Sequence, residues 1–188
     1  TWEAVWVPAS DGQHTITVVA KDPSGRESDA SVSFIADVEP PEGLAIIAPV
    51  SGEYIEDGYT FKATVTDDAG ISAVRITLST YDYTEIVSNA SMGYNSASGY
   101  YEYPFDSTTV EDGTYRVTVY AVDIGGHVVS VTELFYVDNT APVVTIIAPE
   151  QGEIVNSAPY TVTVQAYDSG FTLSYVRYRL DNTGAWYN

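Results

Sequence analysis

The sequence predicts an all-β protein built from repeated two-layer sandwiches. Apolar and polar residues alternate with a period of two, glycine and proline interrupt this pattern at strand-length intervals, and the chain repeats itself. The repeat is clearest where residues 11–22 (DGQHTITVVAKD) return as residues 112–123 (DGTYRVTVYAVD), 101 positions later. Self-similarity near the length of a domain indicates a tandem array of one module.

The period-two alternation defines a set of short strands. In residues 114–122, for example, Tyr115, Val117 and Val119 share one face of the predicted strand. Seven strands are predicted in this way between two proline-containing joints, at residues 45–48, 59–66, 73–79, 84–87, 100–105, 114–122 and 127–137. Seven short alternating strands in about 100 residues are typical of an immunoglobulin-like (Ig-like) sandwich.

The predicted sandwich should bury the apolar faces of its strands. Residues 112–115 (DGTY) resemble the tyrosine corner of Ig-like sandwiches, in which the tyrosine hydroxyl bonds to backbone a few residues upstream. The first copy of the repeat has His14 in place of Tyr115, so His14 is either a ligand or base, or a polar ring that replaces the tyrosine. The predicted core includes Phe61, Val65, Val74, Ile76, Tyr115, Val117 and Val119.

Two joints divide the chain, at residues 37–41 (DVEPP) and 138–142 (DNTAP). Proline ends sheet pairing and stiffens the crossing to the next module. The joints predict the C-terminal half of an Ig-like module in residues 1–38, a complete module in 39–140, and the N-terminal half of a further module in 141–188. We therefore expect the chain to be a segment of a longer protein, because it begins and ends in the middle of a module.

The two predicted half-modules each have an apolar face that they cannot bury alone. The front half is expected to form strands at 145–147, 160–167 and 175–180, and the back half at 2–7, 15–20 and 31–36. We expect the front half, residues 141–188, to be completed either by the back half, residues 1–38, of an identical neighbouring copy, head to tail, or by flanking repeats of a longer chain. A head-to-tail contact that does not close on itself generates a filament.

Charge and composition exclude several classes of function. The chain has 26 acidic residues against 7 basic ones, a net charge of −19, so nucleic acid and membrane insertion are not expected. It has no cysteine and only two histidines in different modules, which leaves no plausible Ser-His-Asp or Cys-His set. We therefore predict that the chain is not an enzyme.

Four segments carry a resemblance to a known family. They read DGTYRVTVYAVDIGG (112–126), FYVDNTAPVVTIIAPEQGEIV (135–155), YTVTVQAYDSG (160–170) and VRYRLDNTGAW (176–186). The chain resembles the tandem bacterial and archaeal Ig-like repeats of surface proteins, which are related in architecture to fibronectin type III domains; only residues 81–99 look like an insertion. The resemblance implies an extracellular or cell-surface protein of a prokaryote, but such modules occur in adhesins, S-layers, stalks and secreted hydrolases.

Acidic residues gather where the predicted modules meet. In an Ig-like sandwich the loops after the second and sixth strands lie at the end where the incoming linker arrives. Carboxylates placed there suit Ca²⁺, which takes six to eight oxygen ligands in irregular geometry; the alternative is that they are ordinary turn residues. The predicted ligands are Asp37, Asp67, Asp68 and Asp123 at the first junction, with Glu39 nearby, and Asp138 and Asp168 at the second, with Glu111 and Asp112 nearby.

Aromatic residues mark candidate interfaces. Six tyrosines fall within residues 81–103, where exposed rings would favour a protein contact or a surface that stacks on sugars, unless alternate members pack into the sandwich. Asn89 opens an Asn-Ala-Ser glycosylation sequon. The predicted interface residues are Trp2, Trp6, Tyr81, Tyr83, Trp186 and Tyr187.

These observations favour a structural role. The sequence predicts a subunit or segment of an extracellular filament, stalk or surface layer, in which stiff Ig-like beads are joined by proline-containing linkers. The alternative is an adhesin or a carbohydrate-binding accessory module of a secreted protein, which a planar array of exposed tyrosine and tryptophan would favour. Glycans are candidate partners in that case.

Overall fold

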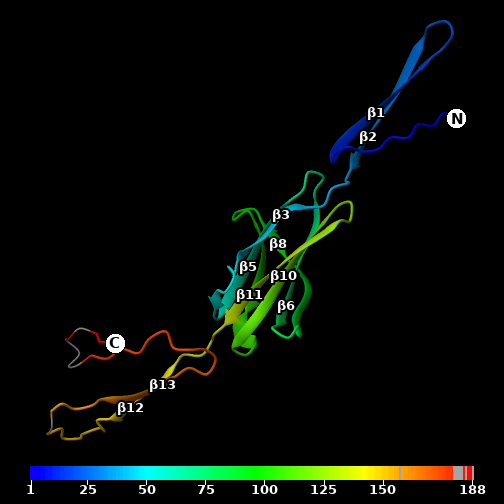
Figure 1. Ribbon diagram of the computed structural model, residues 1–188. Coiled ribbons are helices and arrows are strands. Elements are labelled where there is room, and N and C mark those ends of the chain that lie inside the picture. Colours follow the sequence, from blue (N-terminus) through cyan, green and yellow to red (C-terminus); the bar gives the residue numbers. More distant parts are fainter. Residues whose placement is uncertain (157, 180–183, 185, 188) are drawn as a thin grey trace.

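The protein is an elongated all-β molecule with a sandwich in the middle and a two-stranded hairpin at each end (Figure 1). The computed structural model describes residues 1–156, 158–179, 184, 186 and 187. The N-terminal hairpin pairs β1 (Gly12–Lys21) with β2 (Glu27–Ala36), and the C-terminal one pairs β12 (Val143–Ala148) with β13 (Thr163–Tyr167).

The first sheet of the central sandwich has five strands in the order β4-β11-β10-β6-β7. Neighbouring strands are antiparallel, except that β4 runs parallel to β11. The strands are β4 (Tyr54–Ile55), β6 (Ile71–Thr80), β7 (Glu85–Ser91), β10 (Gly113–Asp123) and β11 (Val128–Val137).

The second sheet has four antiparallel strands in the order β3-β5-β9-β8. A 3₁₀ turn, η1 (Ser107–Thr109), follows β9 and leads toward β10. The strands are β3 (Glu42–Ala48), β5 (Gly58–Thr66), β8 (Gly93–Asn95) and β9 (Tyr100–Asp106).

The core lies between the two sheets and confirms the predicted apolar face. All seven predicted core residues are buried, none more than 7% exposed. Phe61 of β5 and Phe135 of β11 join the sheets, with ring centroids 5.3 Å apart. The tyrosine corner is also confirmed, because the Tyr115 hydroxyl donates a hydrogen bond to the Glu111 carbonyl at 2.7 Å.

His14 occupies the position of Tyr115 in the first hairpin and makes the equivalent contact. Its Nε2 lies 3.0 Å from the carbonyl oxygen of Ser10, which is the repeat equivalent of Glu111. The Trp6 and Phe34 rings pack against the imidazole at centroid distances of 5.1 and 6.0 Å. These contacts agree with a polar ring that replaces the tyrosine.

The seven strands predicted in the central part are all present. β7 is longer than predicted, and the two shortest strands, β4 and β8, were not expected. β4 adds only Tyr54 and Ile55 to the edge of the first sheet, and β8 adds three residues to the edge of the second. Strands this short show no period-two pattern that could identify them.

Two strands predicted in the terminal parts are corrected by the structure. Residues 2–7 form no strand, and the described part of 175–180 contributes only an isolated bridge between Tyr178 and Tyr187; Leu180 lies outside the described residues. The reason is pairing: the equivalent strands of the central sandwich, β9 and β6, pair with β5 and β10. Neither segment has a strand of that kind beside it among the described residues, and unpaired backbone does not form a ladder.

The first prediction concerns the core. Val119 is 1% exposed, so Val119→Ala should lower the free energy of unfolding by roughly 1–3 kcal/mol through lost burial and a residual cavity. The control is Val128→Ala on the neighbouring strand, where the side chain is 59% exposed. Urea denaturation followed by tyrosine and tryptophan fluorescence measures both, and equal losses would show that the register of β10 is wrong.

Candidate metal centre

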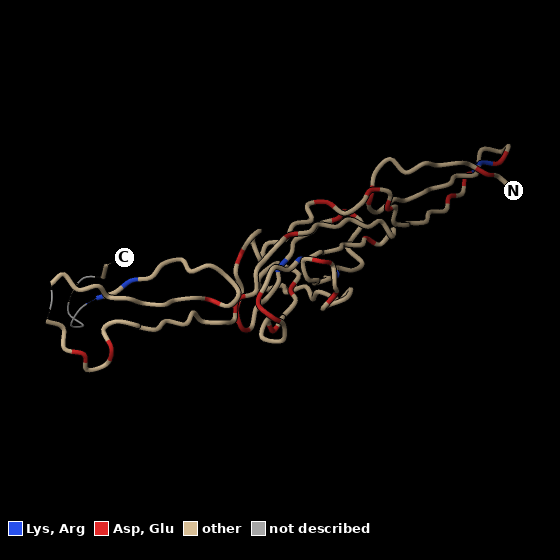
Figure 2. The backbone as a smooth tube through the Cα atoms, turned by 60° about the horizontal axis from the view of Figure 1, so that its bottom comes forward, with Lys and Arg blue, Asp and Glu red and all other residues tan. Residues whose placement is uncertain are grey.

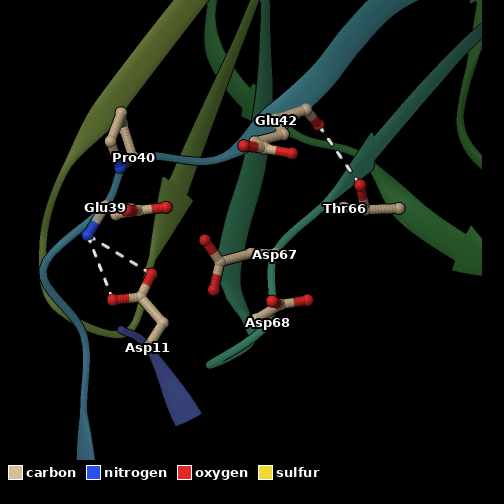
Figure 3. A pocket seen from close by; sticks show the side chains of 7 residues that line it. All are labelled: Asp11, Glu39, Pro40, Glu42, Thr66, Asp67 and Asp68. Carbon is tan, nitrogen blue, oxygen red and sulfur yellow. Dashed lines mark hydrogen bonds between the residues drawn. The ribbon is translucent and has the colours of Figure 1, made fainter. Parts of the chain in front are cut away.

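The first junction is organised by Asp11, which ends the loop before β1. Its carboxylate accepts hydrogen bonds from the backbone N–H of Val38 at 2.6 Å and of Glu39 at 3.2 Å (Figure 3). The linker that leaves β2 is therefore tied back to its own module. Because its path is set at this point, the linker side chain Asp37 is directed toward the central sandwich.

Asp37 meets the loop between β10 and β11 of the central sandwich. The Gly125 N–H donates a hydrogen bond to Oδ2 of Asp37. A Cβ at position 125 would lie 2.7 Å from Cγ of Asp37, so only glycine allows this approach. The Asp37 side chain is 6% exposed, and its other oxygen, Oδ1, is buried without a hydrogen-bond partner.

Asp67 brings a third carboxylate to the junction from the loop after β5. Its Oδ1 accepts hydrogen bonds from the N–H groups of Ala69 and Gly70 at 2.9 and 2.7 Å, which hold the side chain in a local turn. Figure 3 shows this carboxylate pointing toward Asp11 and Glu39. Ligand atoms of Asp11, Asp37 and Asp67 all lie within 4.8 Å of one another.

Two of these carboxylates, Asp11 and Asp67, border a small cavity of about 60 Å³ that has no basic side chain among its lining residues. Asp68, a predicted ligand, also borders it (Figure 3). The cavity is lined by Asp11, Glu39, Pro40, Glu42, Thr66, Asp67 and Asp68. Two like charges 4 Å apart repel by about 4 kcal/mol at an effective dielectric constant near 20, so this arrangement is one that a cation relieves.

Asp123, another predicted ligand, is held by His127 on the other side of Asp37. The backbone N–H and Nδ1 of His127 lie 2.8 and 2.9 Å from its carboxylate oxygens. Burial acts to raise the pKa of Asp123, but the hydrogen bonds from His127 outweigh it and leave that pKa below its ordinary value. The hydrogen bond with Asp123 raises the pKa of His127, against the opposing effect of burial.

The second junction repeats the hydrogen bonds of the first, 101 positions later. Asp112 accepts from the N–H of Asn139 at 2.7 Å, as Asp11 does from Val38, and this bond lowers the pKa of Asp112. Asp168 accepts from the N–H groups of Gly170 and Phe171 at 3.0 and 3.3 Å, as Asp67 does from its own loop. Oδ1 of Asp138 is buried without a partner, as is Oδ1 of Asp37.

The second junction differs from the first in two respects. Among the described residues, no three of its carboxylates come within 4.8 Å of one another as those of the first junction do. An apolar contact is added instead, because the Phe171 ring packs against Tyr54 and Tyr136 at centroid distances of 5.0 and 5.6 Å. The position of Phe171 is occupied by Gly70 at the first junction, where no equivalent ring contact can form.

The structure therefore brings some predicted ligands together and separates others. Asp37 and Asp67 converge. Asp123 does not line the cavity; it is hydrogen-bonded to His127, whose imidazole also lies near Asp37. Whether a metal binds stays a prediction. The sequence analysis missed Asp11 and Glu42, although Asp11 is the repeat equivalent of Asp112, which was placed near the second junction, so the 101-residue repeat itself was the signal for it.

The predicted interface residues fall into three environments. Trp2 is fully exposed, whereas Trp6 packs against the Phe34 ring at 5.3 Å. Tyr81 and Tyr83 both contact the Arg116 guanidinium, at 4.9 and 4.5 Å from their ring centroids. The remaining pair lies near the C-terminus, where Trp186 contacts Arg179 and Tyr187 stacks on Tyr178.

Asn89, the predicted glycosylation position, is exposed on β7 in a left-handed backbone conformation with φ of +48°. Its N–H donates to the Thr77 hydroxyl at 3.1 Å, and its carbonyl accepts from Arg75. The backbone is thus engaged on the sheet while the side chain faces solvent. Interface contact and glycosylation both remain predictions.

Residues 44–119 and 142–186 match the family of bacterial Ig domains, so the chain belongs to that family. The match covers the central sandwich as far as Val119 in β10, and the part that contains the second hairpin. No curated protein matches the chain in sequence. Among the described residues, no helix has the length and apolar character needed to cross a bilayer.

Three solved structures are similar to the chain. A tetra-tandem repeat in the extending region of a large adhesion protein is 22% identical with a TM-score of 0.46, over 83% of this chain and 38% of that one. The fibronectin(III)-like modules of CbhA from Clostridium thermocellum are 20% identical, with a TM-score of 0.39 over 79% and 70%. An endo-β-1,4-mannanase from Thermotoga petrophila is 17% identical, with a TM-score of 0.43 over 55% of this chain and 21% of the mannanase.

The second prediction concerns the approach of Gly125 to Asp37. Gly125→Ala should displace the Asp37 carboxylate and lower the free energy of unfolding by about 1–3 kcal/mol, because the added methyl group has no room. Gly58→Ala is the control, since a Cβ at Gly58 meets nothing within 4 Å. Thermal unfolding compares the two variants, and an unchanged midpoint for Gly125→Ala would mean that the contact does not hold the junction.

Proposed function

We propose that the chain is a structural segment of an elongated extracellular or cell-surface protein, in which Ig-like modules are joined end to end and Ca²⁺ holds the junctions. The role suits a fibre, stalk or surface layer. One observation carries the proposal: the same set of hydrogen bonds recurs at both junctions, with an unpartnered buried carboxylate oxygen at the same position each time.

A cation explains the unpartnered oxygens. A buried carboxylate oxygen without a hydrogen bond is costly, and Oδ1 of Asp37 lies 3.6 Å from Nδ1 of His127, which is too far for a hydrogen bond. At the first junction three carboxylates converge, and two of them, Asp11 and Asp67, border a cavity lined by further acids. Ca²⁺ accepts such a set of oxygens with irregular spacing and can complete its shell with backbone carbonyls and water. Bound there, it would link the linker to the loop after β5.

The open faces of the terminal hairpins support continuation of the array. In the central sandwich Val117 and Val119 are almost completely buried, at 0% and 1% exposure. Their repeat equivalents in β1, Ile16 and Val18, are 41% and 62% exposed. The difference arises from the missing opposite sheet, because the residues and the strand are equivalent.

The second hairpin offers the complementary face. Val144 and Ile146 of β12 and Val164 of β13 are 41–63% exposed, on strands equivalent to β3 and β5 of the central sandwich. β3 and β5 belong to the sheet that faces β10 and β11. We propose that the face of β12 and β13 is covered by the β1–β2 hairpin of a neighbouring copy or by the equivalent strands of flanking repeats, which gives a continuous string of sandwiches.

The carbohydrate-binding alternative is less favoured by the aromatic residues. Stacking on a sugar needs an aromatic face that is open to the ligand. Tyr81 and Tyr83, the most exposed members of the central tyrosine group apart from Tyr94, both hold the guanidinium of Arg116 over their rings. Tyr94 packs against Tyr101, with ring centroids 5.1 Å apart.

The third prediction is a response to calcium. Added Ca²⁺ should raise the thermal midpoint of the full chain, and EDTA should lower it, because a ligand at 100 times its Kd stabilises by about 2.7 kcal/mol. Asp67→Asn should remove the response of the first junction, and Asp168→Asn that of the second. Asp29→Asn, an exposed change on β2, is the matched control.

X-ray scattering in the same series measures the longest dimension of the molecule. The spread of that dimension among the molecules in solution should narrow as Ca²⁺ is added. If neither the thermal midpoint nor the scattering curve changes with Ca²⁺ or EDTA, these acids serve only as turn residues. The open-face argument would be unaffected by that result.

The fourth prediction tests completion of the hairpin faces. Val18→Asp should abolish head-to-tail association of the chain, because it places a charge on the open apolar face of β1. Val19→Asp is the control, since Val19 is on the opposite face of the same strand and is similarly exposed, at 58% against 62%. Analytical ultracentrifugation and electron microscopy measure assembly. Equal assembly by the two variants, or none by the unmodified chain at high concentration, would contradict completion by identical copies.

A further inference from the structure

A second group of candidate metal ligands lies where the linker meets the end of β10 and the loop that follows it, and it shares only Asp37 with the cluster of Asp11, Asp37 and Asp67. Asp37, Asp123 and His127 each place one ligand atom within 4.8 Å of the others. The group combines an imidazole nitrogen with two carboxylates. Imidazole is a poor ligand for Ca²⁺, which prefers oxygen, and a good one for Zn²⁺ and related ions.

The spacing of the ligand atoms fits a small metal ion. His127 Nδ1 lies 2.9 Å from Oδ2 of Asp123 and 3.6 Å from Oδ1 of Asp37. Bonds of about 2.0–2.2 Å in a tetrahedral zinc site place neighbouring ligand atoms roughly 3.3–3.6 Å apart. An ion enters this space with adjustments of a few tenths of an ångström, and the proton on Nδ1 leaves as it binds.

The state of Asp37 points to a ligand independently of the acidic cluster. Its side chain is 6% exposed and its Oδ2 is anchored by the Gly125 N–H, so the carboxylate has little freedom to turn. The remaining oxygen, Oδ1, has no hydrogen-bond partner and faces the imidazole nitrogen. Asp123 is fully buried, while the His127 side chain is 39% exposed, which leaves one side open to a water ligand.

The first copy of the repeat has no histidine at the position equivalent to His127. In the first hairpin Asp22 and Arg26 stand where the central sandwich has Asp123 and His127. Asp22 accepts hydrogen bonds from the Arg26 N–H and Nε at 2.9 and 2.8 Å, so the turn is closed by an ion pair that needs no metal. Arginine has no lone pair to offer a metal, whereas histidine does. The turn itself therefore does not require the histidine.

We propose that Asp37, Asp123 and His127 form a binding site for Zn²⁺ or a similar borderline metal ion at the first junction, with water at the open position. The ion joins the linker to the end of β10 and the loop that follows it. This site goes beyond the proposed structural role: it shares Asp37 with the oxygen cluster, while Asp123 and His127 belong to it alone.

The test measures Zn²⁺ binding to the full chain by competition with a chromophoric chelator, together with the visible spectrum of bound Co²⁺. The unmodified chain should bind one Zn²⁺ through histidine. His127→Arg should bind at least tenfold more weakly and lose the Co²⁺ spectrum, yet remain folded, because it recreates the Asp22–Arg26 turn. His14→Ala, which removes the only other histidine, should bind Zn²⁺ as the unmodified chain does.

Asp67→Asn separates this site from the calcium proposal. It should abolish the calcium response of the first junction and leave Zn²⁺ binding intact, because Asp67 belongs only to the oxygen cluster. Zn²⁺ binding that is as tight in His127→Arg as in the unmodified chain would overturn the site. So would the lack of histidine-dependent Zn²⁺ binding in the unmodified chain, whatever the result with calcium.

Discussion

The capture of the linker backbone by an aspartate of the preceding module is the interaction on which both junctions depend. Asp11 binds the N–H groups of Val38 and Glu39, and Asp112 binds that of Asn139. Each bond determines where the chain leaves one module, and therefore which way the next linker carboxylate, Asp37 or Asp138, points. At the second junction the hydrogen bond from the Asn139 N–H lowers the pKa of Asp112, which favours its charged form.

The Asp11 and Asp112 carboxylates are part of a large excess of acidic over basic residues in the chain. The chain has 26 acids and 7 bases, and Figure 2 shows acidic residues along its whole length with few basic ones between them. Surface charges separated by more than about 10 Å are screened at ordinary salt, so most of this repulsion is mild. At the first junction the carboxylates are within 4.8 Å of one another and partly buried, where screening is weak. The same residues that orient the modules thus create the strongest repulsion, and a bound cation would turn it into attraction.

The sequence predicted the sandwich well and the junction partly, and the difference has a physical cause. Period-two alternation indicates which face of a strand is buried, so the core residues from Phe61 to Val119 could be predicted from it. Strands at residues 2–7 and 175–180 were predicted from their positions in the repeat, but a strand also needs a partner, and pairing is not encoded locally. The convergence of Asp37 and Asp67 followed from topology, whereas the pairing of Asp123 with His127 depends on the geometry of one turn.

Position in the array, more than residue type, decides how each module behaves. Val18 and Val119 are the same residue at equivalent positions, yet one is 62% exposed and the other 1%. In a linear array the stability is approximately a sum of module terms and nearest-neighbour terms. The module term here rests on an apolar core that no cation touches, while the junction term rests on carboxylates and, at the second junction, on Phe171 packed against Tyr54 and Tyr136. Cation concentration should therefore change the stiffness of the array without unfolding its individual modules. The change should be larger at the first junction, where Gly70 provides no ring to pack.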